Sequence, residues 1–341
     1  MVRSFLLRYE RLNAEQLQAR IPPLDLTCYG PPKRMNHADF GTPSGEHIAG
    51  AIFVPNSGYV SDPQLAAHNL RTAAERTGNA TFMYGQSVET IDQAGGKVTG
   101  VTLAGGEKIE APVVVNVGGA QSSKITDMAF GDVGCAAAND MTLTTKPLRV
   151  EVAYLEGPDD FDYGERGTIW MDFDTGAYWR PEVGGKIQVG SVEPDCDELE
   201  WIQDSDSTDA DRGGMNMSLT DHHTNLVYRC ALRIPTVKIP TASATQGCVA
   251  MYDVTEDWIP IYDRSAIDGF YMAIGTSGNQ FKNAGVVSSL MGELVDYCEN
   301  GNDHDRTPLQ LHLEKTGHTL NAGMFSRIRG VSSDTSNSVL G

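Results

Sequence analysis

A run of β-branched residues that ends in two glycines constrains the fold of this chain more than any other feature. The segment Val113–Val117 reads VVVNV, and Gly118 and Gly119 follow it. Such runs are typical of strands buried on both faces, as in a parallel sheet between layers of helices. The pattern returns at Gly269–Gly275 (GFYMAIG), and apolar residues then recur at helical spacing, at Val287, Leu290, Met291, Leu294, Val295 and Cys298. The sequence thus predicts an α/β domain assembled from two distant segments.

A helix and several short strands are predicted before the first of these segments. Asp62 can cap a helix that begins at Pro63 and ends at Gly78. The face of this helix that we expect to be buried contains Leu65, Ala66, Leu70, Ala73 and Ala74. Strands are expected at Ala80–Tyr84, Ser87–Ile91 and Lys97–Leu103, separated by glycine turns.

The middle of the chain has a different pattern. Leu148–Leu155, Thr168–Phe173 and Lys186–Val192 are strand-like and are separated by Gly, Pro and Asp clusters, with little helical periodicity. This pattern predicts an antiparallel sheet. The last forty residues carry no strong periodicity, and an extended tail is expected there.

The charge balance excludes some classes of partner. The 341 residues include 26 Lys and Arg against 45 Asp and Glu, a formal net charge of −19. Nucleic acid is therefore not an expected partner, since such binding needs a basic face. Membrane insertion is not expected either, because the longest uncharged apolar stretch, Ala111–Gly119, is far shorter than the roughly 20 residues of a membrane-spanning helix. Met1–Leu7 lacks a secretory apolar region, so the expected location is the cytoplasm.

The segment Gly275–Asn283 (GTSGNQFKN) suits an anion. It lies between a predicted buried strand and the start of a helix, where free backbone N–H groups and the helix dipole favour negative charge. Lys282 adds a full positive charge. A tight turn with a surface lysine fits the same residues, because a glycine turn without a phosphate fingerprint is a weak signal.

Three segments of the chain resemble one family. They are GYVSDP at Gly58–Pro63, VVVNVGGA at Val113–Ala120 and YMAIGTSGNQFKNA at Tyr271–Ala284. They closely resemble the D-amino-acid oxidase/sarcosine oxidase (DAO) superfamily of FAD-dependent oxidoreductases, in particular bacterial glycine/D-amino acid oxidases, sarcosine oxidase β subunits and dimethylglycine dehydrogenase-like proteins. The ends Met324–Arg327 and Ser338–Gly341 also look like that group. The most specific piece is SGNQFK, which is similar to the family's SGHGFK.

The resemblance implies a fold of class α/β plus α+β. A Rossmann-like FAD/NAD(P)-binding domain of the glutathione-reductase type, here incomplete, is interleaved with an antiparallel-sheet substrate domain. The expected division is a connecting or substrate-domain segment at 1–50, FAD-binding parts at 51–145 and 241–300, the antiparallel substrate domain at 146–240 and a C-terminal tail at 301–341.

The resemblance also implies site residues. The turn would cover the pyrimidine edge of the flavin, where negative charge develops at N1 and O2 on reduction. Lys282 matches a lysine that helps to hold the substrate carboxylate, and Tyr252 looks like an aromatic residue of the substrate pocket. The implied cofactor-binding residues are Val88, Gly118, Gly119, Gly275, Ser277, Gly278, Asn279, Gln280, Phe281 and Lys282.

The implied activity is FAD-dependent oxidation of a carbon–nitrogen bond in a small amino acid or N-methylated amino acid, with hydride transfer to flavin N5. The competing interpretation is a cofactor-free structural subunit or an inactive, truncated remnant of the family. Bound flavin separates the two, because both share one fold over residues 50–300.

The chain departs from the family at its beginning. The family opens with a G-x-G-x-x-G turn that binds the FAD pyrophosphate, whereas this sequence has no two glycines spaced two apart. The resemblance therefore implies that about a hundred residues are missing before Met1. A partner chain is expected to supply that segment, or the exposed sheet edges are expected to cause self-association.

Further departures concern the flavin and oxygen. Ala250 stands where some sarcosine oxidases attach FAD through cysteine, and Cys248 is two residues away, so non-covalent FAD is expected. The oxygen-activating lysine would fall at Gln188, which favours a dehydrogenase or slow oxidase, unless the alignment shifts to Lys186. No metal site is expected, because neither His222-His223 nor Asp303-His304-Asp305 has a second ligand pair at fitting spacing.

Overall fold

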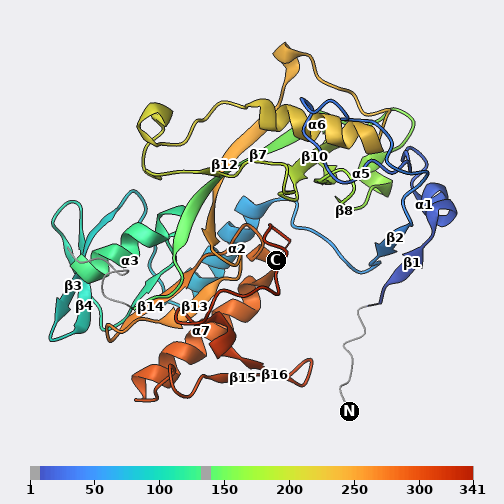
Figure 1. Cartoon of the computed structure of the whole chain (residues 1–341). Helices are drawn as coiled ribbons and strands as arrows, with labels where there is room; N and C mark the ends of the chain where they lie inside the picture. The colour runs from blue at the N-terminus through green and yellow to red at the C-terminus, as the bar shows by residue number, and fades with distance from the viewer. Residues whose placement is uncertain (1–7, 132–139, 341) are drawn as a thin grey trace. The chain divides into compact units, whose positions relative to one another are not determined.

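The computed structural model describes residues 8–131 and 140–340 (Figure 1). The chain divides into two compact units, and it passes between them several times. The first unit comprises the described residues up to Phe82, Glu151–Glu198 and Met217–Ala250, and the second comprises Met83–Val150, Leu199–Asn216 and the residues from Met251 onward. The division differs from the predicted ranges because 51–145 is split at Phe82 and Leu199–Asn216 joins the second unit.

The first unit contains the predicted antiparallel sheet. Strand β7 (Thr145–Glu156) enters it from Glu151 onward and is followed in order by β10 (Lys186–Ser191), β9 (Ala177–Glu182) and β8 (Trp170–Asp172). Alternate residues such as Trp179, Ile187 and Val189 point to one face and are buried. The helix α6 (Asp221–Arg233) shares their apolar cluster through Leu226 and Cys230. The sequence interpretation missed this helix, because its buried face includes Asn225, Arg229 and Arg233.

Shorter elements complete this unit. β1 (Glu10–Leu12) pairs antiparallel with β2 (Ala51–Phe53). The capping box of Asn13 and Gln16 starts α1, in which Leu17 is buried. The remaining helical elements are α1 (Ala14–Arg20), α2 (Pro63–Arg76), α5 (Tyr163–Arg166) and η4 (Ala242–Ala244).

Helix α2 confirms the predicted boundaries but not the predicted burial. The Asp62 carboxylate accepts a hydrogen bond from Leu65 N at 2.8 Å, and Gly78 follows the helix with φ 75°. Of the residues of α2, all of them described, none is buried, and Leu65 and Leu70 are 53% and 65% exposed. The prediction of a buried apolar face is therefore wrong for the described chain, in which no element covers that face.

The second unit carries the predicted α/β sheet. β14 (Phe270–Ile274) pairs antiparallel with β13 (Ile261–Arg264) and parallel with β6 (Val114–Asn116). The helix α7 (Ala284–Glu299) shares an apolar cluster with β13 and β14 through Leu290 and Leu294, as its spacing predicts (Figure 1).

Burial of β6 on both faces is not observed. Val115 is 38% exposed and Val117 is 69% exposed. The reason is that β6 is an edge strand, which pairs with β14 alone within residues 8–131 and 140–340.

An antiparallel meander accompanies this sheet. β3 (Val88–Ala94), β4 (Lys97–Leu103) and β5 (Lys108–Glu110) follow one another across glycine turns. Two of the predicted strands are thus confirmed, whereas the described backbone at Ala80–Tyr84 is irregular. The remaining elements of the unit are η1 (Gly119–Gln121), α3 (Ser122–Phe130), β11 (Glu200–Trp201), η3 (Ala210–Arg212), β12 (Gly247–Thr255), which enters the unit at Met251, η5 (Phe281–Asn283), β15 (Gln310–Leu313), β16 (His318–Asn321) and η6 (Ala322–Phe325).

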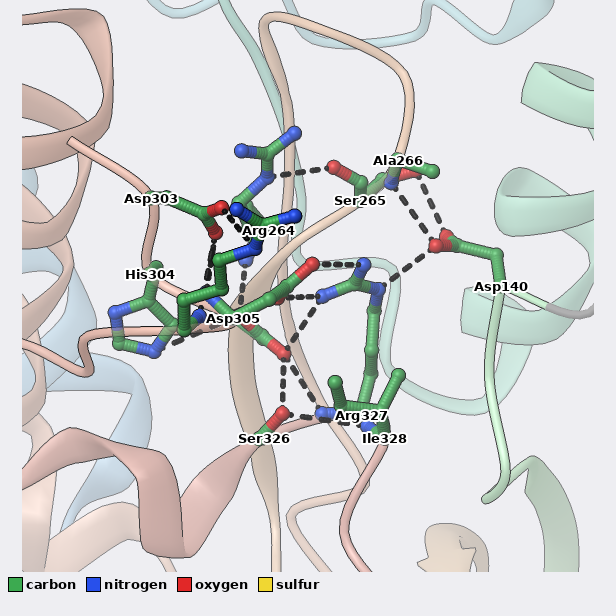
Figure 2. A network of polar contacts seen from close by, with 12 residues as sticks. Asp140, Arg264, Ser265, Ala266, Asp303, His304, Asp305, Ser326, Arg327 and Ile328 are labelled. Carbon is green, nitrogen blue, oxygen red and sulfur yellow. Dashed lines mark hydrogen bonds and ion pairs between the residues drawn. The ribbon is translucent and has the colours of Figure 1, made fainter. Parts of the chain in front are cut away.

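The C-terminal segment is fastened by a buried arginine rather than left as an extended tail. Figure 2 shows Arg327 between Asp140 and Asp305: its Nε lies 2.8 Å from Asp140, and its Nη1 lies 2.7 Å from Asp305. The same Nη1 lies 3.2 Å from a third carboxylate, that of Asp263. The arginine is 3% exposed. The hairpin of β15 and β16 precedes this anchor.

Candidate functional site

The carboxyl ends of the two parallel strands bring two glycine turns to the same edge of a sheet. In the register of β6 and β14, Asn116 lies opposite Met272, so both strands end on one side. β6 leads into Gly118, Gly119 and α3, and β14 leads into Gly275–Lys282 and α7. Ligands of open α/β sheets bind in such a crevice beyond the carboxyl ends of the strands.

Both helices after these turns begin without a capping side chain. Among the described residues, no side-chain hydrogen bond caps α3 at Gln121 or α7 at Asn283, and neither first turn contains an acidic residue. The N–H groups of Ser122 and Ala284 already donate to Gly119 O and Phe281 O, so it is mainly the positive end of each helix dipole that favours a negatively charged ligand here.

The second turn requires glycine. Gly275 and Gly278 have φ 67° and 74°, in the left-handed region. A Cβ on Gly275 would lie 2.4 Å from Thr255 Cγ2, and a Cβ on Gly278 would lie 2.5 Å from Cζ of Tyr252. Between them Ser277 adopts φ 50° without being glycine, and its Oγ donates to Gly275 O at 3.1 Å. The structure thus places Tyr252 against the turn.

Polar contacts tie the rest of the turn together. Lys282 Nζ donates to Asn279 O at 2.8 Å, although the lysine side chain is exposed. Gln280 Nε2 donates to Asn279 Oδ1, and Gln280 Oε1 accepts from Tyr262 Oη at 3.2 Å and Asn283 Nδ2 at 2.7 Å. Phe281 is 53% exposed. The amides at positions 279 and 280 therefore stabilise the turn, which leaves the lysine head near the surface.

The first turn depends on a buried amide. Asn116 Oδ1 accepts from Gly118 N at 3.0 Å, while its Nδ2 donates to Ser122 O at 2.8 Å and Thr126 Oγ1 at 3.0 Å. Gly119 has φ 54°, and no described atom lies within 4 Å of a Cβ built there. This glycine presents an open backbone surface to a ligand.

A carboxylate that the sequence interpretation missed connects the two turns. Asp253 on β12 is 4% exposed, and its Oδ2 accepts from Gly275 N at 2.7 Å while its Oδ1 accepts from Ser122 Oγ at 2.9 Å. Burial raises the pKa of Asp253 to about 6, against the opposing effect of the Gly275 N–H and the Ser122 and Thr145 hydroxyls. Only its position directly after Tyr252 could have drawn attention to it.

Val88 lies apart from these residues in the sheet topology. It begins β3 and pairs with Leu103, on the meander rather than on the sheet that carries the turns, and it is 36% exposed. The structure therefore brings together Gly118, Gly119, Gly275, Ser277, Gly278 and Tyr252 around one sheet edge, through the contacts of Asn116 and Asp253.

Two residues of the first unit bear on the expected oxygen chemistry. Gln188 Oε1 accepts from Arg180 Nη2 at 2.7 Å, and Arg180 also pairs with Glu182 at 2.9 Å. Lys186 Nζ donates to Gln246 Oε1 at 2.7 Å. Cys248, in the same unit, is an exposed free thiol. Gln188 and Lys186 therefore each have a polar partner within the first unit.

Other candidate regions lack the features of this site. A cavity of about 370 Å³ lies at the amino end of β14, and two ion pairs occupy its lining, Lys97 with Glu299 at 3.5 Å and Arg264 with Asp268 at 3.6 Å. In the described ranges no group of three His, Cys, Asp or Glu side chains is arranged to hold a metal ion. Every helix in those ranges is too short or too polar to cross a membrane.

Comparisons with known proteins agree with this fold. The profile of the family described as "DAO: FAD dependent oxidoreductase" matches residues 3–294. A glycine oxidase of Geobacillus kaustophilus is 22% identical over 275 residues, which are 80% of this chain and 63% of that protein. The chain therefore spans less than two thirds of the length of this curated relative.

Two solved structures share the fold. The crystal structure of glycine oxidase from Geobacillus kaustophilus superimposes with a TM-score of 0.60 at 18% identity, over 95% of this chain and 68% of that one. The crystal structure of L-proline dehydrogenase from P. horikoshii gives 0.59 at 17% identity, over 94% and 68%. At these identities the likeness concerns the fold.

Proposed function

The chain belongs to the DAO family of FAD-dependent oxidoreductases, and on that basis we propose that it binds FAD and oxidises a carbon–nitrogen bond of a small amino-acid-like substrate. The observation that carries the proposal is the pair of glycine turns, each ahead of an uncapped helix, at the carboxyl edge of β6 and β14. This edge is where an α/β sheet holds a nucleotide cofactor.

The residues of both turns fit the flavin end of FAD. The open backbone at Gly119 leaves space for close approach of a planar group. In the second turn the N–H groups of Gly275, Ser277 and Asn279 donate within the chain, so the α7 dipole and the other N–H groups of the turn are proposed to face the pyrimidine edge. When bound, FAD supplies the acceptor for the hydride that leaves the substrate carbon. Nothing in the turns requires a covalent link, so non-covalent FAD is proposed.

Substrate binding is proposed for Lys282 and Tyr252. Lys282 Nζ has one hydrogen bond to a backbone carbonyl and an exposed side chain, so it can reorient towards a substrate carboxylate. The ring of Tyr252 packs on Gly278 and would form a wall of the pocket beside the turn. The chain's part in the reaction is then to position the amine, provided that it binds unprotonated.

The pyrophosphate of FAD needs a segment that these residues do not provide. The sequence has no G-x-G-x-x-G turn. Among the described residues one edge of β6 has no pairing strand, and exposed Val115 in β6 and Val117 just after it suit a further parallel strand there. We infer that a further segment, on the same or a partner polypeptide, pairs with β6. Self-association through this edge is the expected behaviour when that segment is absent.

The identity of residue 188, a glutamine, leads to a proposal about which electron acceptor reoxidises the flavin. In the family resemblance Gln188 occupies the position of an oxygen-activating lysine, and a neutral amide there would stabilise a developing superoxide less than a lysine does, which favours a dehydrogenase or slow oxidase. The preference does not hold if Lys186 occupies that position instead. Stopped-flow reoxidation of substrate-reduced protein by air and by an artificial dye distinguishes the two. Rapid reoxidation by air alone would contradict the preference for a dehydrogenase.

The visible spectrum of the purified chain tests FAD binding. After addition of FAD and gel filtration, flavin absorbance bands should elute with the protein, and Gly278→Val should abolish them because its side chain meets Tyr252. Gly285→Ala in α7, where a built Cβ meets no described atom within 4 Å, is the matched control and should retain the bands. A folded wild-type chain that stays colourless would overturn the proposal in favour of a cofactor-free subunit.

A further inference from the structure

One buried carboxylate touches both turns of the proposed flavin site. Asp253 accepts from Gly275 N through Oδ2 and from Ser122 Oγ through Oδ1. Its own backbone carbonyl accepts from Ser277 N at 2.8 Å. Ser122 is the first residue of α3, directly after the Gly118–Gln121 turn. The position of each turn is therefore coupled to the side chain of Asp253.

This carboxylate has no ion-pair partner within the described part of the chain, and its negative charge lies directly behind the Gly275 N–H. The charged groups on the surrounding elements are Lys124 and Asp127 of α3, Lys146, Arg149, Glu151 and Glu156 of β7, Glu256 and Asp257 after β12, and Lys282 of the turn. Lys124 binds Asp204 and Asp206, and Arg149 pairs with Glu200. Within the described residues, the polar partners of the Asp253 carboxylate are thus the Gly275 N–H and the hydroxyls of Ser122 and Thr145.

We propose that Asp253 is a proton-controlled positioning residue that sets how strongly the Gly275–Lys282 turn binds an anion. As a carboxylate it weakens anion binding, and as a carboxylic acid it strengthens it. The inference rests on the proposed function in one respect, since the anion is reduced FAD, whose pyrimidine edge gains negative charge on reduction.

The contacts allow both protonation states. The Oγ atoms of Ser122 and Thr145 lie 2.7 Å apart, and either can donate to the other. When a proton from solvent binds Asp253 Oδ1, the Ser122 hydroxyl turns to donate to Thr145 and accepts from the acid, while Oδ2 still accepts from Gly275 N. Protonation therefore removes the charge and keeps the turn in place.

Linkage makes the effect reciprocal. An anion on the outer side of the turn is repelled by the carboxylate behind it, so anion binding favours uptake of one proton by Asp253. Burial has already raised the pKa of this group to about 6, so the proton exchanges near neutral pH. Reduction of bound FAD should then become more favourable as the pH falls through this range.

The first test uses the full chain without flavin. In a ¹⁵N-glycine-labelled sample, the Gly275 amide is identified as the resonance that Gly275→Ala removes. Its shift should follow pH with a midpoint near 6 in the wild type and stay constant in Asp253→Asn. A Gly275 resonance that is insensitive to pH between 5 and 8 would overturn the inference, whether or not the chain binds FAD.

The second test uses the FAD-loaded chain. At pH 8, Asp253→Asn should raise the ratio of the affinities for reduced and oxidised FAD by about tenfold over the wild type, read from the midpoint potential, because couplings of this kind are commonly 5- to 150-fold. At pH 5 the two proteins should coincide. Asp268→Asn removes an equally negative but 71% exposed side chain from the same unit and should match the wild type at both values.

The outcomes separate the two proposals. Equal potentials for Asp253→Asn and the wild type at pH 8 would overturn the role of Asp253 and leave FAD binding intact. A chain that takes up no FAD would overturn the proposed function, while the Gly275 resonance still decides whether Asp253 exchanges a proton behind the turn, without which it cannot control the turn.

Discussion

Two buried aspartates on consecutive strands of the second unit differ in how their charge is compensated. Asp263 on β13 is fully buried and accepts from Arg327, which also binds Asp140 and Asp305 (Figure 2). Asp253 on β12 is nearly as buried, yet in the described part of the chain its carboxylate accepts from an N–H group and hydroxyls and from no charged group. The arginine cluster anchors the C-terminal segment, whereas Asp253 lies behind a proposed ligand-binding turn.

The consequence for protonation differs accordingly. A third buried aspartate, Asp257, lies two residues after β12 and pairs with Arg329 at 2.9 Å. Burial would raise the pKa of Asp257, but hydrogen bonds and the charge of Arg329 outweigh burial and hold that pKa below its usual range. At Asp253 only hydrogen bonds, and no positively charged side chain, counter the effect of burial on the pKa, which rises to about 6. A buried carboxylate with an arginine stays charged and fixed, whereas one with hydroxyls can exchange a proton near neutral pH.

The largest expected effect tests the arginine cluster. Arg327→Met leaves three carboxylates without their shared partner, and we expect a loss of about 3–5 kcal/mol in the free energy of unfolding. Urea unfolding measures it. Arg306→Met, which removes an 87% exposed arginine paired with Asp303, should cost about 0.5 kcal/mol or less. Equal losses for both variants would show that the Arg327 cluster contributes no more to the free energy of unfolding than an exposed ion pair does.

The next effect tests the carboxylate without an arginine. Between about pH 4 and 6, folded Asp253 holds a proton that the unfolded chain has released, so wild-type stability falls as the pH rises through this range. Asp253→Asn has no carboxyl group to titrate at this position, so its free energy of unfolding does not fall for this reason. Its advantage over the wild type should therefore grow with pH to about 3 kcal/mol above pH 7, from about 2 pKa units. Thermal unfolding from pH 4.5 to 8 measures the difference, and a constant difference would contradict the prediction.

A smaller effect compares the two glycine turns. Gly275→Ala combines a positive φ with a contact of 2.4 Å to Thr255 Cγ2 and should destabilise the chain by about 2–3 kcal/mol. Gly119→Ala has a positive φ but open space around its Cβ, so about 1 kcal/mol is expected. Chemical denaturation of both variants gives the difference. A larger loss at Gly119 would mean that packing against Thr255 is not the decisive term.

The smallest effect on stability is expected at Lys282. Lys282→Met removes an exposed ammonium group and should change the free energy of unfolding by less than about 0.5 kcal/mol. In FAD-loaded protein it should weaken the binding of an amino-acid substrate by about tenfold, because a charge-assisted hydrogen bond is lost. Titration monitored by flavin absorbance measures this, with Lys315→Met as the exposed control. Unchanged binding would remove Lys282 from the substrate site.

Local sequence signals predicted local structure well. The Asp62 cap, the Gly78 end of α2, the β3–β4 hairpin around Gly95 and the apolar spacing of α7 all appear as expected, because each depends on residues only a few positions apart. The family resemblance was also readable from the SGNQFK segment at Ser277–Lys282, and the family profile confirms it.

Burial could not be predicted in the same way. The residues of VVVNV were expected inside a sheet, yet Val115 and Val117 are exposed because β6 is an edge strand in the described structure. The apolar face of α2 is exposed for a similar reason. A pattern of apolar residues shows that a segment can be buried, but its burial depends on a neighbouring element from elsewhere.

The sequence by itself determined the family, the two glycine turns and the helix that follows the second of them, whereas the helix α3 after the first turn was not predicted. Only the tertiary structure decided that Asp253 would join them, because its partners Ser122, Thr145 and Gly275 come from three other elements of the chain. Strand register and packing create that cluster, and they also place an arginine beside Asp263 and none beside Asp253 among the described residues. The charge environment of a buried group is a property of neighbours in space, which the order of residues does not specify.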